Sequence, residues 1–209
     1  MIFQNRVDAG RQLAARLRPL AEEGVVVLGL PRGGVPVADE VARALGAPLD
    51  VVVVRKLGVP THPELAMGAI GEDGVRIIND EIVDWLRIAT EQIAQVERRE
   101  RAELQRRAEL FRAGRSRVPV AGRTVVIVDD GLATGATARA ACLVVRAHGA
   151  ARVVLAVPVA PLGWEEKLGD AADEYVCLSA PEDFDAVGQF YADFRATSDD
   201  EVIECLRDA

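Results

Sequence analysis

The sequence predicts an α/β fold, with a doubly wound, mainly parallel β-sheet flanked by helices and a small hood or lid. Short apolar runs rich in Val alternate with segments of helical periodicity, which is the pattern of strands buried on both faces. Half of the residues are hydrophobic but only 4% are aromatic, so the core must consist mainly of Val, Leu, Ile and Ala. The 209 residues suffice for one full core, and we expect residues 1–209 to form a single domain.

The first half of the chain contains the pattern of a βαβ unit. Residues 25–29 form one apolar run, residues 34–45 have helical periodicity and end at Gly46, and residues 49–54 form a second apolar run. A strand, a helix and a strand at this spacing predict a right-handed crossover between parallel strands. An amphipathic helix precedes the unit, with apolar residues at helical spacing at Val7, Leu13, Leu17 and Leu20.

The middle of the chain is less regular in sequence. Residues 57–74 mix Gly, Pro and polar residues, and we expect a flexible loop in which 65–70 could be a short strand paired with 75–78. Asn79 then caps a helix, and a highly charged helix follows over residues 90–112. Acidic and basic residues are interspersed along that helix, which favours a solvent-exposed face over nucleic-acid binding.

The second half resumes the alternation and ends in an aromatic-rich segment. The predicted strands cover residues 124–128, 153–157 and 174–178, and the helices between them cover 136–148 and 164–168. The C-terminal segment, residues 179–209, contains three of the five Phe residues and one of the two Tyr residues. This segment is interpreted either as a small hydrophobic subdomain or as a hood over a planar ligand.

Composition excludes several classes of partner. The formal net charge of −8 argues against a nucleic-acid-binding surface. The three Cys residues form no CxxC pair, which favours a reducing compartment. The sequence contains neither the pattern of a signal peptide nor an apolar run long enough for a membrane span. We therefore expect a cytoplasmic protein without nucleic-acid or membrane partners.

The strongest functional signal follows the predicted strand at 124–128. Asp129 and Asp130 stand at its carboxyl end, where ligands bind in open α/β sheets. Residues 131–137 supply Gly and Thr and lead directly into a helix, whose N-terminal amides suit a phosphate. Paired carboxylates would repel that phosphate unless they bind another part of the ligand, such as the vicinal hydroxyls of a sugar. The segment therefore predicts a cradle for a ribose 5-phosphate.

Two other phosphate-binding patterns do not fit this chain. A Walker loop needs a Lys after its second Gly, and no Lys occurs in the segment that begins at Gly131. The dinucleotide fingerprint GxGxxG is interrupted after Gly29, because Pro31 stands where the second Gly should be.

The segment VVIVDDGLATGAT, residues 125–137, resembles the signature with which type I phosphoribosyltransferases bind 5-phosphoribosyl-1-pyrophosphate (PRPP). Both acids, the Thr-Gly pair and the final Thr are present. The PRGG turn after the first predicted strand resembles the pyrophosphate loop of that family, and Arg55-Lys56 matches the position of a basic pyrophosphate contact. The motifs RKLG and PELAxGAI also resemble phosphoribosyltransferase domains of unassigned substrate. The likeness covers roughly residues 25–180.

The resemblance implies a type I phosphoribosyltransferase-like fold and a PRPP-dependent pentosyltransferase. Such an enzyme moves ribose 5-phosphate onto a nitrogenous acceptor, commonly a nucleobase, and releases pyrophosphate. The implied PRPP-binding residues are Asp129, Asp130, Gly131, Leu132, Ala133, Thr134, Gly135, Ala136 and Thr137. The implied pyrophosphate-binding residues are Arg32, Gly33, Gly34, Arg55 and Lys56. The implied catalytic set is Lys56, Arg32, Asp129 and Asp130.

The resemblance also implies a cofactor and moving parts. Mg²⁺ is expected mainly on PRPP oxygens, with unknown protein ligands. Residues 57–74 would close over the site, and homodimers are common in the family. Enzymes for hypoxanthine and guanine commonly carry an acidic residue at the position of Ala133, so the alanine makes that substrate class less expected.

Two other functions stay open. A regulator that binds PRPP or a nucleotide without catalysis would keep the same cradle, and binding without turnover would identify it. A Mg²⁺-dependent phosphatase with Asp129 as nucleophile would form an aspartyl phosphate, although the Thr-Gly-x-Thr loop fits that chemistry less well.

Overall fold

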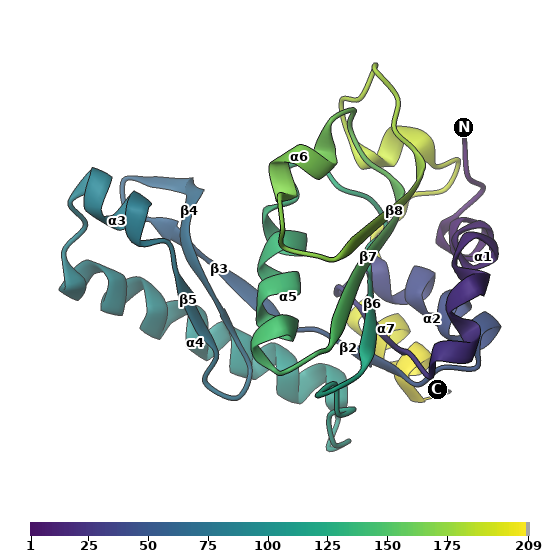
Figure 1. Ribbon diagram of the computed structural model, residues 1–209, viewed down its shortest axis with the longest axis horizontal. Helices are drawn as coiled ribbons and strands as arrows, with labels where there is room; N and C mark the ends of the chain where they lie inside the picture. Colours follow the sequence, from purple (N-terminus) through teal and green to yellow (C-terminus); the bar gives the residue numbers. More distant parts are fainter. Residues whose placement is uncertain (208–209) are drawn as a thin grey trace.

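The structure, a computed structural model, describes residues 1–207 and contains a five-stranded parallel central sheet (Figure 1). The last two residues of the predicted hood segment, 208–209, lie outside the described residues. The strands lie in the order β2-β1-β6-β7-β8, so they run outward from β1 to one side and from β6 to the other. Their bounds are Val26–Gly29 (β1), Leu49–Val51 (β2), Thr124–Val128 (β6), Arg152–Val159 (β7) and Glu174–Ser179 (β8). The predicted doubly wound sheet is confirmed.

Helices cover both faces of the central sheet (Figure 1). Helices α1 (Arg6–Leu17) and α2 (Gly34–Leu45) pack together on one face, where their apolar positions meet the Val side chains of the strands. Helix α5 (Ala136–Ala147) and the short α6 (Trp164–Leu168) cover the other face. The last helix, α7 (Asp199–Arg207), packs against α2. No helix within residues 1–207 is long and apolar enough to span a membrane.

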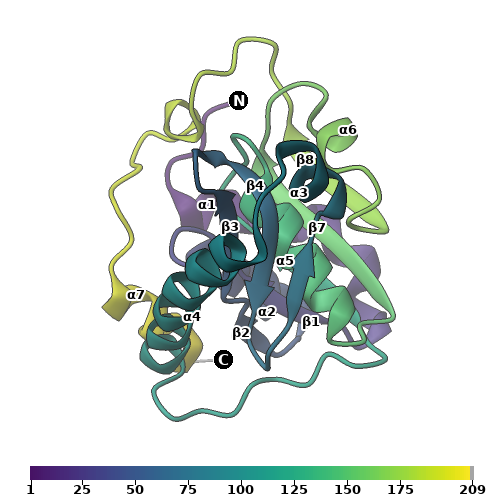
Figure 2. The same cartoon turned by 90° about the vertical axis from the view of Figure 1, so that its left-hand side faces the viewer.

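A second, antiparallel sheet projects from the main body, and we call residues 54–112 the arm (Figure 1). The sheet consists of β3 (Val54–Val59), β4 (His62–Gly71) and β5 (Arg76–Ile78), and α3 (Asp80–Leu86) follows it. Helix α4 (Thr90–Arg112) lies along the arm and contacts both β3 and α7 (Figure 2). The predicted charged helix and the predicted pairing of the strands near residues 70 and 76 are confirmed.

Two expectations for this region are wrong. The apolar run at 49–54 is not one strand, because β2 ends at Val51 and the chain then enters the arm. Residues 57–74 are not irregular throughout but form the second half of β3 and the whole of β4. The glycines that suggested a loop allow close packing: a Cβ on Gly58 would lie 2.5 Å from the carbonyl oxygen of Pro63, and one on Gly68 would overlap that of Ile77. Movement of this segment stays a prediction.

A buried ionic cluster joins the base of the arm to the central sheet. Arg112, at the end of α4, is 8% exposed and its Nε lies 3.4 Å from Oδ1 of Asp50. The same guanidinium donates to Oε2 of Glu72 at 2.9 Å and to the carbonyl oxygen of Val51 at 3.1 Å. Oδ2 of Asp50 accepts a further hydrogen bond from the amide of Val118 at 2.9 Å. These contacts fix where the arm leaves the body.

Residues 184–194 of the C-terminal segment, which we call the aromatic segment, form a small hydrophobic cluster with Phe3. Phe190 and Tyr191 are buried together with Phe3, and Phe184 and Phe194 pack against them. Two backbone hydrogen bonds of 2.8 Å hold Phe3 against this segment. The amide of Phe3 donates to the carbonyl of Phe190, and the amide of Ala192 donates to the carbonyl of Phe3. The predicted hydrophobic packing is confirmed, while its role as a lid stays a prediction.

Candidate functional site

Two loops meet at the carboxyl ends of β1 and β6, where the strand order of the central sheet reverses. The connections that leave these two adjacent parallel strands go to opposite sides of the sheet, so a crevice remains between them at the carboxyl ends. Ligands bind in this crevice in open α/β folds. The first loop, residues 30–33, leads from β1 to α2, and the second, residues 129–135, leads from β6 to α5. A hydrogen bond of 2.8 Å from the amide of Leu30 to the carbonyl of Val128 holds the two loops together.

The first loop approaches the acid pair closely, and glycine makes this approach possible. A Cβ on Gly33 would overlap Oδ2 of Asp130, and one on Gly34 would lie 2.6 Å from the carbonyl oxygen of Val128 and 3.0 Å from Oδ1 of Asp129. Any larger residue at either position would force the loops apart. The structure thus brings Gly33 and Gly34 beside the two acids.

The acid pair is partly buried and held by residues from both ends of the chain. The side chain of Asp130 is 14% exposed, and its Oδ2 accepts a hydrogen bond from Nε of Arg6 at 2.8 Å. The hydroxyl of Tyr191 donates to the main-chain carbonyl of Asp130 at 2.6 Å. Arg6 also lies 4.1 Å from the ring centroid of Phe194. The C-terminal segment therefore contacts the acid pair directly through Tyr191.

Burial changes the acidity of these groups. It raises the pKa of Asp129 well above its ordinary value, and the neighbouring charge of Asp130 adds to this increase. Burial also raises the pKa of Asp130, although the Arg6 guanidinium opposes that rise. Two adjacent carboxylates with raised pKa values are typical of a site that binds a ligand through one or both of them.

The second loop is open at its tip and anchored at its base. Ala133, Thr134 and Thr137 are exposed, whereas Leu132 is buried and its amide donates to the carbonyl of Val159 at 2.9 Å. Gly135 has a φ of 74°, which turns the chain into the first residue of α5. The exposed Thr134 and Thr137 thus flank the N-terminus of α5, where the first amides of a helix suit an anion.

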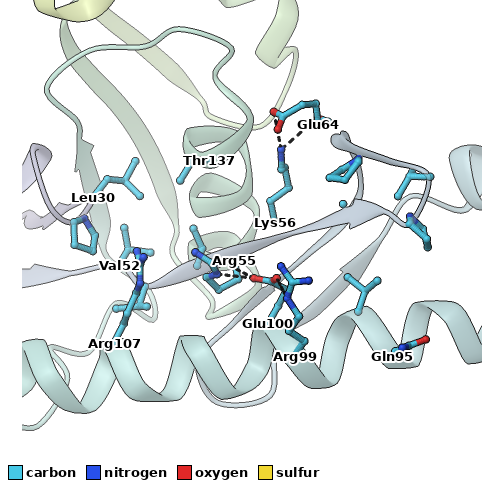
Figure 3. Close-up of a pocket in the computed structure, with 18 of the residues that line it drawn as sticks. Leu30, Val52, Arg55, Lys56, Glu64, Gln95, Arg99, Glu100, Arg107 and Thr137 are labelled. Carbon is cyan, nitrogen blue, oxygen red and sulfur yellow. Dashed lines mark hydrogen bonds and ion pairs between the residues drawn. The ribbon is translucent and has the colours of Figure 1, made fainter.

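A cavity of about 740 Å³ lies between the arm and the start of α5 (Figure 3). Its lining includes Pro31 of the first loop, Thr137 in the first turn of α5, and Arg55 and Lys56 of β3. A cavity of this size accommodates a small phosphorylated ligand.

The cations in the cavity are paired with acids of the arm. Arg55 donates from Nε to Oε2 of Glu100 at 2.8 Å, and Nη2 of Arg55 lies 2.6 Å from the same oxygen. Nζ of Lys56 lies 3.5 Å from Oε2 of Glu64 and 3.3 Å from its carbonyl oxygen. Arg55 and Lys56 begin the arm rather than follow a strand of the central sheet, yet the arm brings them to the same opening as Thr137.

The side chain of Arg32 contacts helix α7. Its side chain is half exposed, and Nη1 lies 3.6 Å from Oδ1 of Asp199 at the start of α7. Arg32 does not line the cavity that Lys56 lines, and its role stays a prediction.

Sequence reasoning missed the residues that complete the site. Arg6 and Tyr191 lie far from Asp130 in sequence, and neither belongs to a motif that would have indicated the contact. Helix α4 was interpreted as a solvent-exposed element, although part of it lines the cavity. That face could have been found from helical spacing, since its lining residues are Gln92, Gln95, Val96, Arg99, Glu100 and Arg107.

Comparisons with known proteins agree with this geometry. A family model described as "Phosphoribosyl transferase domain" matches residues 1–195. A protein of Mycobacterium tuberculosis named "Putative phosphoribosyl transferase" is 62% identical over 205 residues, which cover 98% of this chain and 46% of the relative. This chain thus spans about half the length of the curated relatives that match it along its whole length.

Two further similarities are informative. The crystal structure of the protein TT1426 from Thermus thermophilus superposes with a TM-score of 0.91 at 48% identity, covering 100% of this chain and 99% of that one. A stretch of 52 residues is 56% identical to an adenine phosphoribosyltransferase of Kineococcus radiotolerans, covering 24% of this chain and 28% of that protein.

Proposed function

Because the chain belongs to the phosphoribosyl transferase domain family, we propose that it transfers ribose 5-phosphate from PRPP to a nitrogenous acceptor and releases pyrophosphate. The observation that carries this proposal is the meeting of the two loops at Asp129 and Asp130, beside the N-terminus of α5. One ligand with a sugar diol between two phosphate groups matches this arrangement, because acids, amides and cations each meet a complementary part of it.

In this proposal the second loop and the acid pair fix the sugar. The amides of residues 133–137 and the hydroxyls of Thr134 and Thr137 bind the 5-phosphate at the start of α5. The carboxylates of Asp129 and Asp130 accept hydrogen bonds from the two ribose hydroxyls. Arg6 then has a positioning role, since its hydrogen bond to Asp130 orients the carboxylate beneath the sugar.

The opposite end of the site binds the leaving group. The bond from C1 to the pyrophosphate oxygen breaks as the acceptor nitrogen attacks C1, and negative charge builds up on the departing pyrophosphate. Lys56, Arg55 and the amides of the Pro31–Gly34 turn stabilise this charge. The salt bridge between Arg55 and Glu100 holds the guanidinium in place before the ligand arrives.

Mg²⁺ fits this site as a cofactor bound mainly by the ligand. Within residues 1–207 no cluster of three His, Cys, Asp or Glu side chains could hold a metal, so phosphate and ribose oxygens would supply most of its ligands. The protein groups nearest to those oxygens would be the carboxylates of Asp129 and Asp130. The ion would neutralise charge on the pyrophosphate.

The acceptor is proposed to be a nucleobase bound below the aromatic segment. Phe184 and Phe190 stack with centroids 5.5 Å apart, and Tyr191 connects this cluster to Asp130. Planar bases bind to aromatic faces of this kind. The similarity of 52 residues to an adenine phosphoribosyltransferase makes adenine the first base to test.

The direct test is pyrophosphate release from PRPP and Mg²⁺ with a panel of purine and pyrimidine bases. We expect release that depends on both PRPP and one class of base. PRPP binding by calorimetry without release for any base would favour the alternative of a regulator, which has support in the pairing of Arg55 and Lys56 with acids. Absence of PRPP binding would contradict both.

PRPP affinity should fall as the pH is lowered through a range above 3.9, the usual pKa of Asp. The raised pKa values mean that the unliganded acids bind protons more tightly than free Asp, while the ribose hydroxyls need carboxylate acceptors. Binding therefore releases protons as the pH approaches these values from above. Calorimetry in buffers of different ionisation enthalpy measures this release.

The control for this measurement is inorganic pyrophosphate with Mg²⁺, because phosphate groups of the ligand also titrate, near pH 6, and pyrophosphate carries no ribose hydroxyls. Proton release that is equal for PRPP and for pyrophosphate would assign the effect to the phosphate groups and contradict the prediction.

A further inference from the structure

Helix α4 presents positively charged side chains to the cavity, and the proposed reaction assigns no role to them. The cavity is lined by four cationic side chains and two carboxylates, in a chain whose net charge is −8. Such a local excess of cations in an acidic protein indicates an anionic ligand. Of the described residues that line the cavity, none is aromatic, so a stacked base is not the occupant that it favours.

The excess lies on α4 rather than on β3. Glu100 forms its short contact with Arg55 at 2.6 Å, so Arg99, at 3.5 Å from the other carboxylate oxygen, is only weakly compensated. The side chain of Arg99 is 87% exposed. Lys56 lies at the same distance of 3.5 Å from Glu64, but no second cation among the described residues is paired with that carboxylate, whereas Arg99 shares Glu100 with Arg55.

Arg107 is only half compensated as well. Its Nε donates to Oε1 of Glu103 at 2.7 Å, but Glu103 also accepts two hydrogen bonds from Arg106, at 2.9 Å and 3.0 Å. One carboxylate thus serves two guanidinium groups. Figure 3 shows the side chain of Arg107 rising from α4 toward Val52 and Leu30, next to the loop that carries Pro31.

We propose that Arg107 and Arg99 bind the pyrophosphate group of the ligand, so that α4 forms one wall of the leaving-group pocket. This inference rests on the proposed function and deepens it. The pyrophosphate would lie between the first loop, Lys56 and α4, with Arg107 beside the loop and Arg99 farther along the cavity. Guanidinium groups suit this role because their paired N–H donors match phosphate oxygens.

The chain offers a matched control for each arginine. Arg106 has the same charge and the same partner, Glu103, as Arg107, but it does not line the cavity. Arg98 is exposed and adjacent to Arg99, and it does not line the cavity either. We therefore compare Arg107→Gln with Arg106→Gln, and Arg99→Gln with Arg98→Gln. Each pair loses the same charge, so a difference in binding within a pair reports the position of the side chain.

The experiment measures binding of inorganic pyrophosphate with Mg²⁺ by calorimetry, with inorganic phosphate and PRPP as parallel probes. We expect Arg107→Gln to weaken pyrophosphate and PRPP binding about tenfold, with Arg99→Gln weakening it less and both controls staying within about twofold. Inorganic phosphate, which can also occupy the 5-phosphate loop, should be affected less than pyrophosphate. Arg107→Lys should recover part of the loss, because it keeps the charge but not the paired donors.

The outcomes separate this inference from the proposed function. If Arg107→Gln and Arg106→Gln weaken pyrophosphate binding equally, α4 acts only through general charge and the inference is wrong, even when PRPP turnover is intact. If the wild type binds pyrophosphate through Arg107 but does not bind PRPP, the result supports the pyrophosphate pocket and contradicts the proposed transfer reaction. Unchanged thermal unfolding of the variants excludes misfolding as the cause.

Discussion

Replacing both Asp129 and Asp130 with Asn is expected to weaken PRPP binding by about 10²- to 10⁴-fold. Each charge-assisted hydrogen bond from a ribose hydroxyl contributes about 1.5–3 kcal/mol, and about 1.4 kcal/mol corresponds to tenfold in affinity. Asn keeps the shape of the side chain but loses its charge, so the loops stay in place while the acceptors weaken. Calorimetric titration with PRPP and Mg²⁺ measures the change.

The matched control for this variant is Asp183→Asn, which removes an exposed carboxylate of the aromatic segment. Its PRPP affinity should equal that of the wild type. Equal affinity of the double variant and the wild type would show that the acid pair does not bind the ribose.

Replacing Arg112 with Met is expected to lower the free energy of unfolding by about 3–5 kcal/mol, because it leaves buried carboxylates without their partner. Asp50 is 5% exposed, and Glu72 accepts two hydrogen bonds from Arg112, so both lose their compensation at once. Urea denaturation monitored by circular dichroism measures the loss.

Arg98→Met is the control, since it removes an exposed arginine from the same helix and should change stability by no more than about 0.5 kcal/mol. Adding Glu72→Met to Arg112→Met should restore part of the stability, because the second change removes one of the unpaired charges. A loss for Arg112→Met as small as that for Arg98→Met would mean that the cluster does not stabilise the base of the arm.

The sequence predicted the central sheet and the position of the acid pair because both depend on local patterns. Runs such as 124–128 are typical of strands buried on two faces, and acids that directly follow such a parallel strand lie at the carboxyl edge of the sheet. The Gly-Gly pair at 33–34 was recognised from the resemblance of the PRGG turn to a pyrophosphate loop, and the structure adds the reason, since only glycine permits the close approach to the acids.

The arm and the contacts of the acids could not be predicted in the same way. Gly58 and Gly68 indicate a loop when read alone, and only the partner strands show that they permit tight antiparallel packing. The pairing of Arg6 with Asp130 joins residues 124 positions apart, so it depends on the path of the whole chain. The same holds for Arg107, whose position at the cavity depends on how the arm folds back toward the central sheet.

The hydrophobic core continues without a break from α1 and α2 into the arm, and this affects how the protein opens. Leu57 and Met67 of the arm's sheet and Leu104 of α4 belong to the same buried cluster as Leu13 and Val41. Separately melting units need separate cores, and the arm has none of its own. We therefore expect the amide protons at the buried positions of β3 and β4 to exchange with solvent through the same cooperative opening as those of the central sheet, so that the buried base of the arm and the central sheet unfold together.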